Sequence, residues 1–121
     1  MLKRLWETKF LLLLILILGS FLRFYNIDWD QGQHLHPDER FLTMVATSMV
    51  IPHSFVDYLN PQTSTMNPAN IGHPFYVYGT LPVVITKLAA VALGADNYMD
   101  ITILGRLLSG SADVLVIFLI Y

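Results

Sequence analysis

The sequence predicts an all-α integral membrane protein, and its composition and charge pattern carry this prediction. Of the 121 residues, 55% are hydrophobic and only 13% are charged, whereas soluble domains have about 45–50% apolar and about 25% charged residues. Three apolar segments reach, with their flanks, the length of a membrane-spanning helix. The formal net charge of −2 offers no basic field that could recruit nucleic acid, so we expect no nucleic-acid partner.

The first predicted transmembrane helix covers residues 1–25, with a basic N-terminus ahead of the apolar run 10–22. That run is short enough for the core of a signal peptide, but no small-residue cleavage site follows it. Arg23 and bulky aromatic residues come next instead. We therefore expect an uncleaved helix whose terminal basic side chains reach the membrane surface.

The second region, residues 26–74, is predicted to be a long extracytoplasmic loop that contains one amphipathic helix at the membrane surface. Residues 37–50 form this helix, because Pro37 suits the first turn and Pro52 stops the helix from continuing. One face of the helix carries four residues at helical spacing: Asp38, Leu42, Val45 and Met49. After Pro52, frequent Pro, Asn, Ser and Thr without periodicity predict a loop.

Two further transmembrane helices are predicted at 75–93 and 101–121, joined by a short turn at 94–100. An ionisable residue inside a span is a functional candidate, and Asp113 lies inside the third one. A hydrogen bond from Asp113 to a nearby serine or to another span is an equally good explanation. Because the third helix stops at Tyr121 without flanking charges, we expect the chain to be truncated.

The distribution of Lys and Arg predicts the orientation of these helices in the plasma membrane. Five basic residues would lie at or near the cytoplasmic side: Lys3, Arg4, Lys9, Lys87 and Arg106. Only Arg23 and Arg40 would lie outside. We therefore expect a multi-pass protein with a cytoplasmic N-terminus, an outer segment 26–74 and a cytoplasmic turn 94–100.

The stretch "HLHPDERF", residues 34–41, concentrates charge in an otherwise apolar chain. Asp38 and Glu39 fall in the first turn of the predicted helix, where the helix dipole favours negative charge by about 0.3–1 kcal/mol. Stabilising the start of the helix could be the whole role of these two carboxylates. A second His-Pro pair, at His73, would lie at the same level of the membrane, and this favours a functional site.

Metal binding is an alternative interpretation of the same stretch. The candidate ligands of a divalent metal are His34, His36, Asp38 and Glu39. An H-x-H pattern brings both imidazoles to one side only in a strand, and a site needs three or four converging ligands. The chain has no cysteine, which excludes a thiolate metal site and a disulfide framework.

The order of these features resembles the N-terminal part of the GT-C membrane glycosyltransferases. The closest groups are the family 39 protein O-mannosyltransferases and the aminoarabinose-transferase-like enzymes. The matching features are a basic N-terminus, a first span ending "LRFYNI", an outer helix opening with Asp38–Glu39, a His-Pro at His73, and "GRLLSGSADVLVIFLIY". The resemblance covers nearly the whole chain. It departs at Phe75, where the family has a second proline, at "RLLS" in place of "RLPS", and at Arg40, which follows Glu39 directly.

The resemblance implies that the complete enzyme transfers a sugar from a polyprenyl-phosphate-linked donor to an acceptor hydroxyl, with inversion, at the outer membrane face. It implies that Asp38 is the catalytic base. The residues expected to bind substrate are Glu39, Arg40, His73 and Arg23. The last three supply the cationic or donor groups that a leaving phosphate needs, and Glu39 orients the acceptor or pairs with Arg40. The expected partners are a protein, lipid or glycan acceptor, membrane lipids and the remaining spans. No metal or cofactor is assigned, and the fragment alone should be inactive.

A non-catalytic role is the alternative to this enzyme. The chain would then be a membrane module, or a metal-binding loop on a small membrane anchor. A reading frame that continues past Tyr121 with many more spans favours the enzyme, and a stop codon there favours the module.

Overall fold

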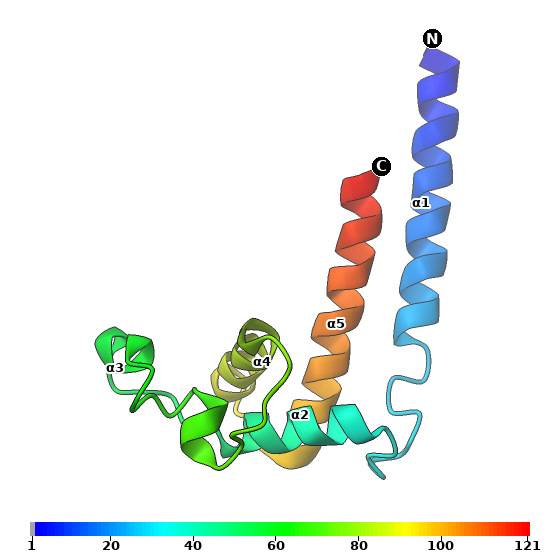
Figure 1. The fold of residues 1–121 in the computed structure, drawn as a ribbon. Helices are drawn as coiled ribbons and strands as arrows, with labels where there is room; N and C mark the ends of the chain where they lie inside the picture. The colour runs from blue at the N-terminus through cyan, green and yellow to red at the C-terminus, as the bar shows by residue number, and fades with distance from the viewer. Residues whose placement is uncertain (1) are drawn as a thin grey trace. The chain divides into compact units, whose positions relative to one another are not determined.

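The regular structure of the described residues consists only of helices, as expected for an all-α protein. The computed structural model describes the backbone of residues 2–121 and the side chains of residues 9–121. Its elements, shown in Figure 1, are α1 (Leu2–Phe24), α2 (Pro37–Ser48), α3 (Phe55–Leu59), the 3₁₀ turn η1 (Pro68–Ile71), α4 (Thr80–Ala92) and α5 (Tyr98–Ile120). They fall into two units. One contains residues 1–29 and 106–121, and the other contains residues 30–105.

In the first unit, α1 and the second half of α5 lie side by side and run in opposite directions (Figure 1). Two glycines allow this close approach. A Cβ atom at Gly19 would lie 3.2 Å from Ile117 Cδ1, and one at Gly110 would lie 2.9 Å from the Phe24 ring. Small residues at such contacts are typical of helices that pack in a membrane.

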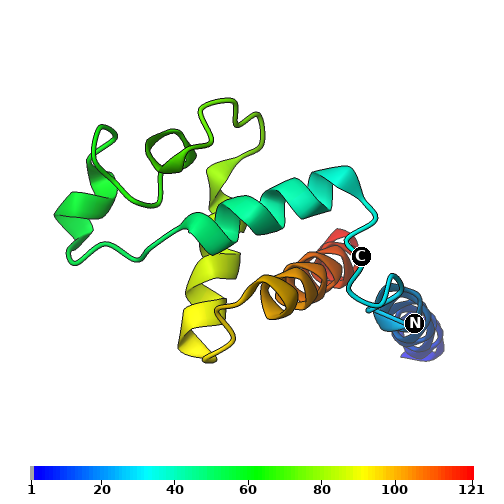
Figure 2. The same ribbon diagram turned by 90° about the horizontal axis from the view of Figure 1, so that it is seen from below.

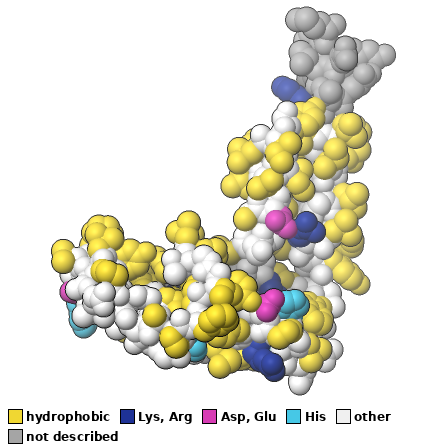
Figure 3. All heavy atoms as spheres, viewed as in Figure 1, with side chains coloured by type: hydrophobic (Ala, Val, Ile, Leu, Met, Phe, Trp, Pro, Cys, Tyr) yellow, Lys and Arg dark blue, Asp and Glu magenta, His cyan; other side chains and the backbone are white. Residues whose placement is uncertain are grey.

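Among the described residues, α5 is the one helix that is long and apolar enough to cross a membrane. Its 23 residues extend about 34 Å, which exceeds the roughly 30 Å of the hydrocarbon core. Most large apolar side chains of both helices in this unit are exposed, as the yellow surface in Figure 3 shows. On α1 they include Phe10, Ile17 and Leu22, and on α5 Leu115, Phe118 and Leu119.

The antiparallel arrangement of α1 and α5 differs from the predicted three alternating spans, which would make the first and third helices parallel. The Arg106 Nη1 atom on α5 donates to the carbonyl of Ile27, just beyond the end of α1, at 2.8 Å. The chain therefore leaves α1 and enters this part of α5 at the same end of the unit. If both helices cross a membrane, the number of crossings between these two points is even.

Helix α4 also begins five residues later than the predicted second span and has only 13 residues. Its length of about 20 Å is below that of a hydrocarbon core. Gly79 precedes the helix in an extended conformation, and Pro82 is its third residue. A proline there costs no hydrogen bond, because the first N–H groups of a helix have no partner within it. The sequence pattern placed Pro82 deep inside a helix, whereas it marks the first turn.

The second unit has a hydrophobic core between α2, α4 and the start of α5. Figure 2 shows α2 crossing α4. The buried core residues are Val45, Ala46, Met49, Met66, Val83, Val84, Ala90 and Ile101. Of the predicted face of α2, Val45 and Met49 are in this core, Leu42 is half-buried and Asp38 is exposed. The apolar side of α2 thus packs against other parts of the chain.

The ends of the helices follow local capping signals. Helix α2 begins at Pro37 as predicted and ends at Ser48, two residues before the predicted end. Helix α5 begins three residues early, because the Asn97 side chain accepts the N–H of Asp100 at 3.1 Å and caps it. The predicted loop contains α3 and η1, which are capped by Ser54 and Asn67.

Candidate functional site

The acidic turn that the sequence singled out is the first turn of α2. His36 is the N-cap residue, and its Nδ1 atom accepts the N–H of Glu39 at 3.4 Å. Asp38 is exposed, Glu39 is half-buried and Arg40 is exposed. This cap holds the backbone of the acidic pair at a helix start, where a carboxylate is electrostatically favoured.

The segment 73–78, which precedes α4, runs along α2 in the opposite direction. At one end, His73 Nε2 lies 3.3 Å from Ser48 Oγ in the last turn of α2. At the other end, the Tyr78 hydroxyl is hydrogen-bonded to Asp38 in the first turn. The lengths agree, because five extended steps cover about 16–17 Å and ten helical steps cover about 15 Å.

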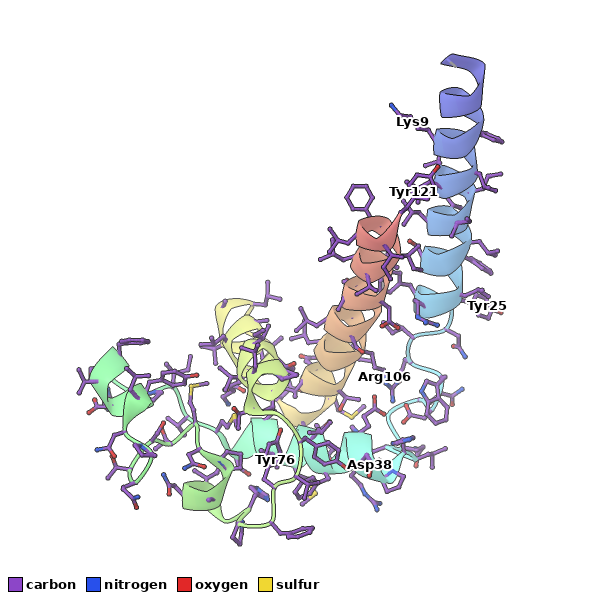
Figure 4. All side chains as sticks on the ribbon, turned by 45° about the horizontal axis from the view of Figure 1, so that its top comes forward. Lys9, Tyr25, Asp38, Tyr76, Arg106 and Tyr121 are labelled. Atoms are coloured by element: carbon purple, nitrogen blue, oxygen red, sulfur yellow. The ribbon has the colours of Figure 1, made fainter. Side chains whose placement is uncertain are left out.

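The ring of Phe41 lies between the two ends of segment 73–78. Its centroid lies 5.8 Å from that of His73, 6.2 Å from that of Tyr76 and 6.2 Å from that of Tyr78. The Tyr76 and Tyr78 rings are 5.9 Å apart. In Figure 4, Asp38 lies at the start of α2 and Tyr76 lies beside this helix. We call these residues, together with Ser48, the α2 surface: Asp38, Phe41, Ser48, His73, Tyr76 and Tyr78.

The two tyrosines of the α2 surface make different hydrogen bonds. The Tyr76 hydroxyl donates to the carbonyl of Gly79 at 3.2 Å. The hydrogen bond to Asp38, then partial burial and the charge of Asp38, raise the pKa of Tyr78 above its ordinary value. Tyr78 lies before the first residue of α4 and remains a hydrogen-bond donor to the carboxylate at neutral pH.

Two of the predicted site residues, Asp38 and His73, thus lie on one surface at opposite ends of the aromatic cluster. Arg40 follows on α2 but is exposed. Arg23 belongs to the other unit, where its Nε atom donates to Asp113 Oδ2 at 2.7 Å. The predicted phosphate-binding role of Arg23 stays a prediction, and Asp113 has a partner on another apolar helix, one of the two explanations left open.

His34 does not converge with the acidic pair, as a metal site would require. It is buried, with its Nδ1 atom 3.3 Å from Thr102 Oγ1 and its Nε2 atom 3.3 Å from Met99 Sδ. Thr102 in turn contacts Thr43 Oγ1 at 3.0 Å. Among the residues whose side chains are described, no three His, Asp or Glu side chains form a metal-binding group.

The basic residues within the second and third predicted spans have structural partners. Arg106 donates to Ile27 and lies 5.5 Å from the centre of the Trp29 ring, which fixes the turn after α1. The buried Nζ of Lys87 lies 2.6 and 2.8 Å from the two carboxylate oxygens of Asp96. This pair ties α4 to the turn that precedes α5.

Sequence reasoning missed four members of the α2 surface: Phe41, Ser48, Tyr76 and Tyr78. A signal for two of them was present in "FYVYG", where Phe75 and Val77 are exposed and Tyr76 and Tyr78 are half-buried. This period of two is typical of an extended segment with one covered face. The apolar composition made the same residues look like the start of a transmembrane helix.

Comparison of this chain with protein-family models, curated proteins and solved structures finds no match.

Proposed function

We propose that this chain is the N-terminal part of a membrane glycosyltransferase that uses a polyprenyl-phosphate-linked sugar as donor. The proposal rests on the order of its sequence motifs. The observation that carries it is that Asp38 and His73 lie on the same side of α2, at opposite ends, with the Phe41 ring between them. A base for an acceptor hydroxyl and a donor group for a leaving phosphate are the two functions this reaction requires.

The chemistry assigned to the α2 surface is an inverting displacement. Asp38 takes the proton of the acceptor hydroxyl as its oxygen attacks the anomeric carbon from the face opposite the phosphate. The bond from that carbon to the phosphate oxygen breaks, and His73 and Arg40 stabilise the charge on the departing polyprenyl phosphate. Glu39, about 100° further round the helix, orients the acceptor. Arg23 is not assigned to the site, because it is paired with Asp113.

In this proposal α1 and α5 cross the plasma membrane, the N-terminus is cytoplasmic and the α2 surface faces outward. The exposed apolar side chains of both helices support the two crossings, since a large apolar surface is unfavourable in water. With two crossings, Lys87 and Arg106 lie on the outer side. The basic residues then divide as three inside (Lys3, Arg4, Lys9) and four outside (Arg23, Arg40, Lys87, Arg106), so the orientation rests on the assigned reaction rather than on the charge count.

The substitution Asp38→Asn in the full-length protein tests the proposal, because it keeps the shape of the side chain and removes its basicity. General base catalysis contributes about 10²–10⁴-fold, so turnover of a polyprenyl-phosphate-linked sugar should fall by that factor. Membrane insertion and donor binding should persist. Asp57→Asn, which changes an exposed aspartate on α3, is the matched control and should retain turnover. Near-normal turnover of Asp38→Asn would mean that the acidic pair only stabilises the start of α2.

A further inference from the structure

The hydroxyl of Ser48 determines which protons the His73 ring can carry. Its one proton is committed to the carbonyl of Met44, to which Ser48 Oγ donates at 2.8 Å. At its 3.3 Å contact with His73 Nε2, the serine oxygen must therefore accept a hydrogen bond. The Nε2 atom must carry the proton that is donated.

This assignment limits what His73 can offer to an anion. A neutral imidazole has one N–H, and here that group points at Ser48, so Nδ1 has only a lone pair. A lone pair repels a phosphate oxygen. Only the protonated ring, with N–H groups at both nitrogens, can donate from Nδ1 while it keeps its bond to Ser48.

The position of the ring is fixed from several sides. The backbone N–H of His73 donates to the carbonyl of Pro68 at 2.9 Å. The ring meets Phe41 edge-on, with an interplanar angle of 85°. The titratable groups that share the Phe41 cluster are the hydroxyls of Tyr76 and Tyr78, with Asp38 beyond them. No carboxylate or other charged group is bonded to the His73 ring among the side chains described.

We propose that Ser48 is a positioning residue that fixes the tautomer of His73, and that His73 binds the donor phosphate as an imidazolium through Nδ1–H. This inference rests on the proposed function and specifies the protonation state of one of its residues. Donor binding then depends on pH, because only the protonated ring offers an N–H group to the phosphate.

The test measures binding of polyprenyl methyl phosphate to the full-length protein in lipid nanodiscs from about pH 5 to about pH 8. This phosphodiester keeps one negative charge over the range, whereas a phosphomonoester has a second pKa of about 6 that would obscure the result. Wild-type affinity should fall by at least about tenfold as pH rises, because the cation is lost. His73→Lys should bind with little dependence on pH, since lysine stays charged.

Ser48→Ala and Thr47→Ala form a matched pair that tests the role of Ser48. Each hydroxyl donates to the carbonyl four residues earlier, at 2.8 Å in both cases, but only Ser48 contacts His73. Loss of one hydrogen bond corresponds to roughly a three- to tenfold effect. Ser48→Ala lets the neutral ring carry its proton on Nδ1, so its binding at high pH should exceed that of the wild type by that factor, and Thr47→Ala should bind as the wild type does.

Two results would overturn the inference while the proposed function stands. The first is wild-type binding that does not change with pH, and the second is equal binding by Ser48→Ala and Thr47→Ala. If the wild type binds no polyprenyl methyl phosphate at any pH and also transfers no sugar, the proposed function fails together with the inference.

Discussion

The α1/α5 pair and the unit of residues 30–105 differ in how they bury their side chains. The pair exposes most of its large apolar side chains and holds its two helices together by glycine contacts and the Arg23–Asp113 ion pair. The other unit buries an apolar core and also buries polar groups such as His34, Thr43 and Lys87. Each buried polar side-chain atom among the described side chains has a hydrogen-bond partner. The second unit thus has a buried apolar interior that the described part of the first unit lacks, although both units expose large apolar side chains, such as Phe75 and Leu81 in the second.

The largest expected effect is all-or-none. It concerns whether α4, in the unit of residues 30–105, crosses the membrane as α1 and α5 are proposed to do. The chain has no cysteine, so single cysteines at Thr63 and Ala92 can be labelled selectively. Because α1 and α5 are antiparallel, both positions should lie on the same side of the membrane, and in the proposed orientation both should react with an impermeant reagent added to intact cells. Labelling of Thr63→Cys from outside and of Ala92→Cys only after permeabilisation would mean that α4 crosses the membrane.

The next largest effect should come from the core of residues 30–105. Met49→Ala removes a fully buried side chain and should destabilise this unit by about 2–5 kcal/mol, the usual cost of such a cavity. Met44→Ala changes the same residue type within α2, which ends just before Met49, but Met44 is 46% exposed, and the variant should lose less than about 1 kcal/mol. Hydrogen exchange of α2 and α4 amides in lipid nanodiscs measures the difference. Similar losses for the two variants would mean that α2 does not bury this face.

A smaller effect should identify the Arg23–Asp113 pair as a contact between α1 and α5. A double-mutant cycle with Arg23→Ala, Asp113→Ala and both together should give a coupling energy of about 1 kcal/mol, since polar contacts between membrane helices average about 0.6 kcal/mol. Unfolding in detergent or bicelles measures it. Strictly additive effects would show that the two side chains do not interact, and Arg23 would again be a candidate for binding phosphate.

The smallest expected effect concerns the hydroxyl of Tyr78. Tyr78→Phe keeps the ring against Phe41 but removes the hydrogen bond to Asp38. Because that bond helps to hold the carboxylate in place, its loss should lower the pH–turnover profile by roughly threefold at neutral pH. Tyr76→Phe removes a hydroxyl that donates to Gly79, so its profile should match the wild type. Identical profiles for the two variants would remove Tyr78 from the site.

The sequence by itself determined the all-helical class and the positions of α2 and α5 to within a few residues. It did so because their signals are local. Pro37 at the helix start, Pro52 beyond its end and a long apolar run act within about one turn of the chain. The same locality explains why Asp38 was found in the first turn of a helix. A helix start needs only its own residues to be recognised.

Only the tertiary structure decided the direction of α5 relative to α1, the partner of Arg23 and the path of segment 73–78. Asp113 is 90 residues from Arg23 in sequence, and no local pattern specifies such a pair. The alternation in "FYVYG" and the Pro82 signal fit both an extended segment and the start of an apolar helix. Packing of Tyr76 and Tyr78 against Phe41 selected the extended form, because contacts between distant residues outweigh weak local preferences.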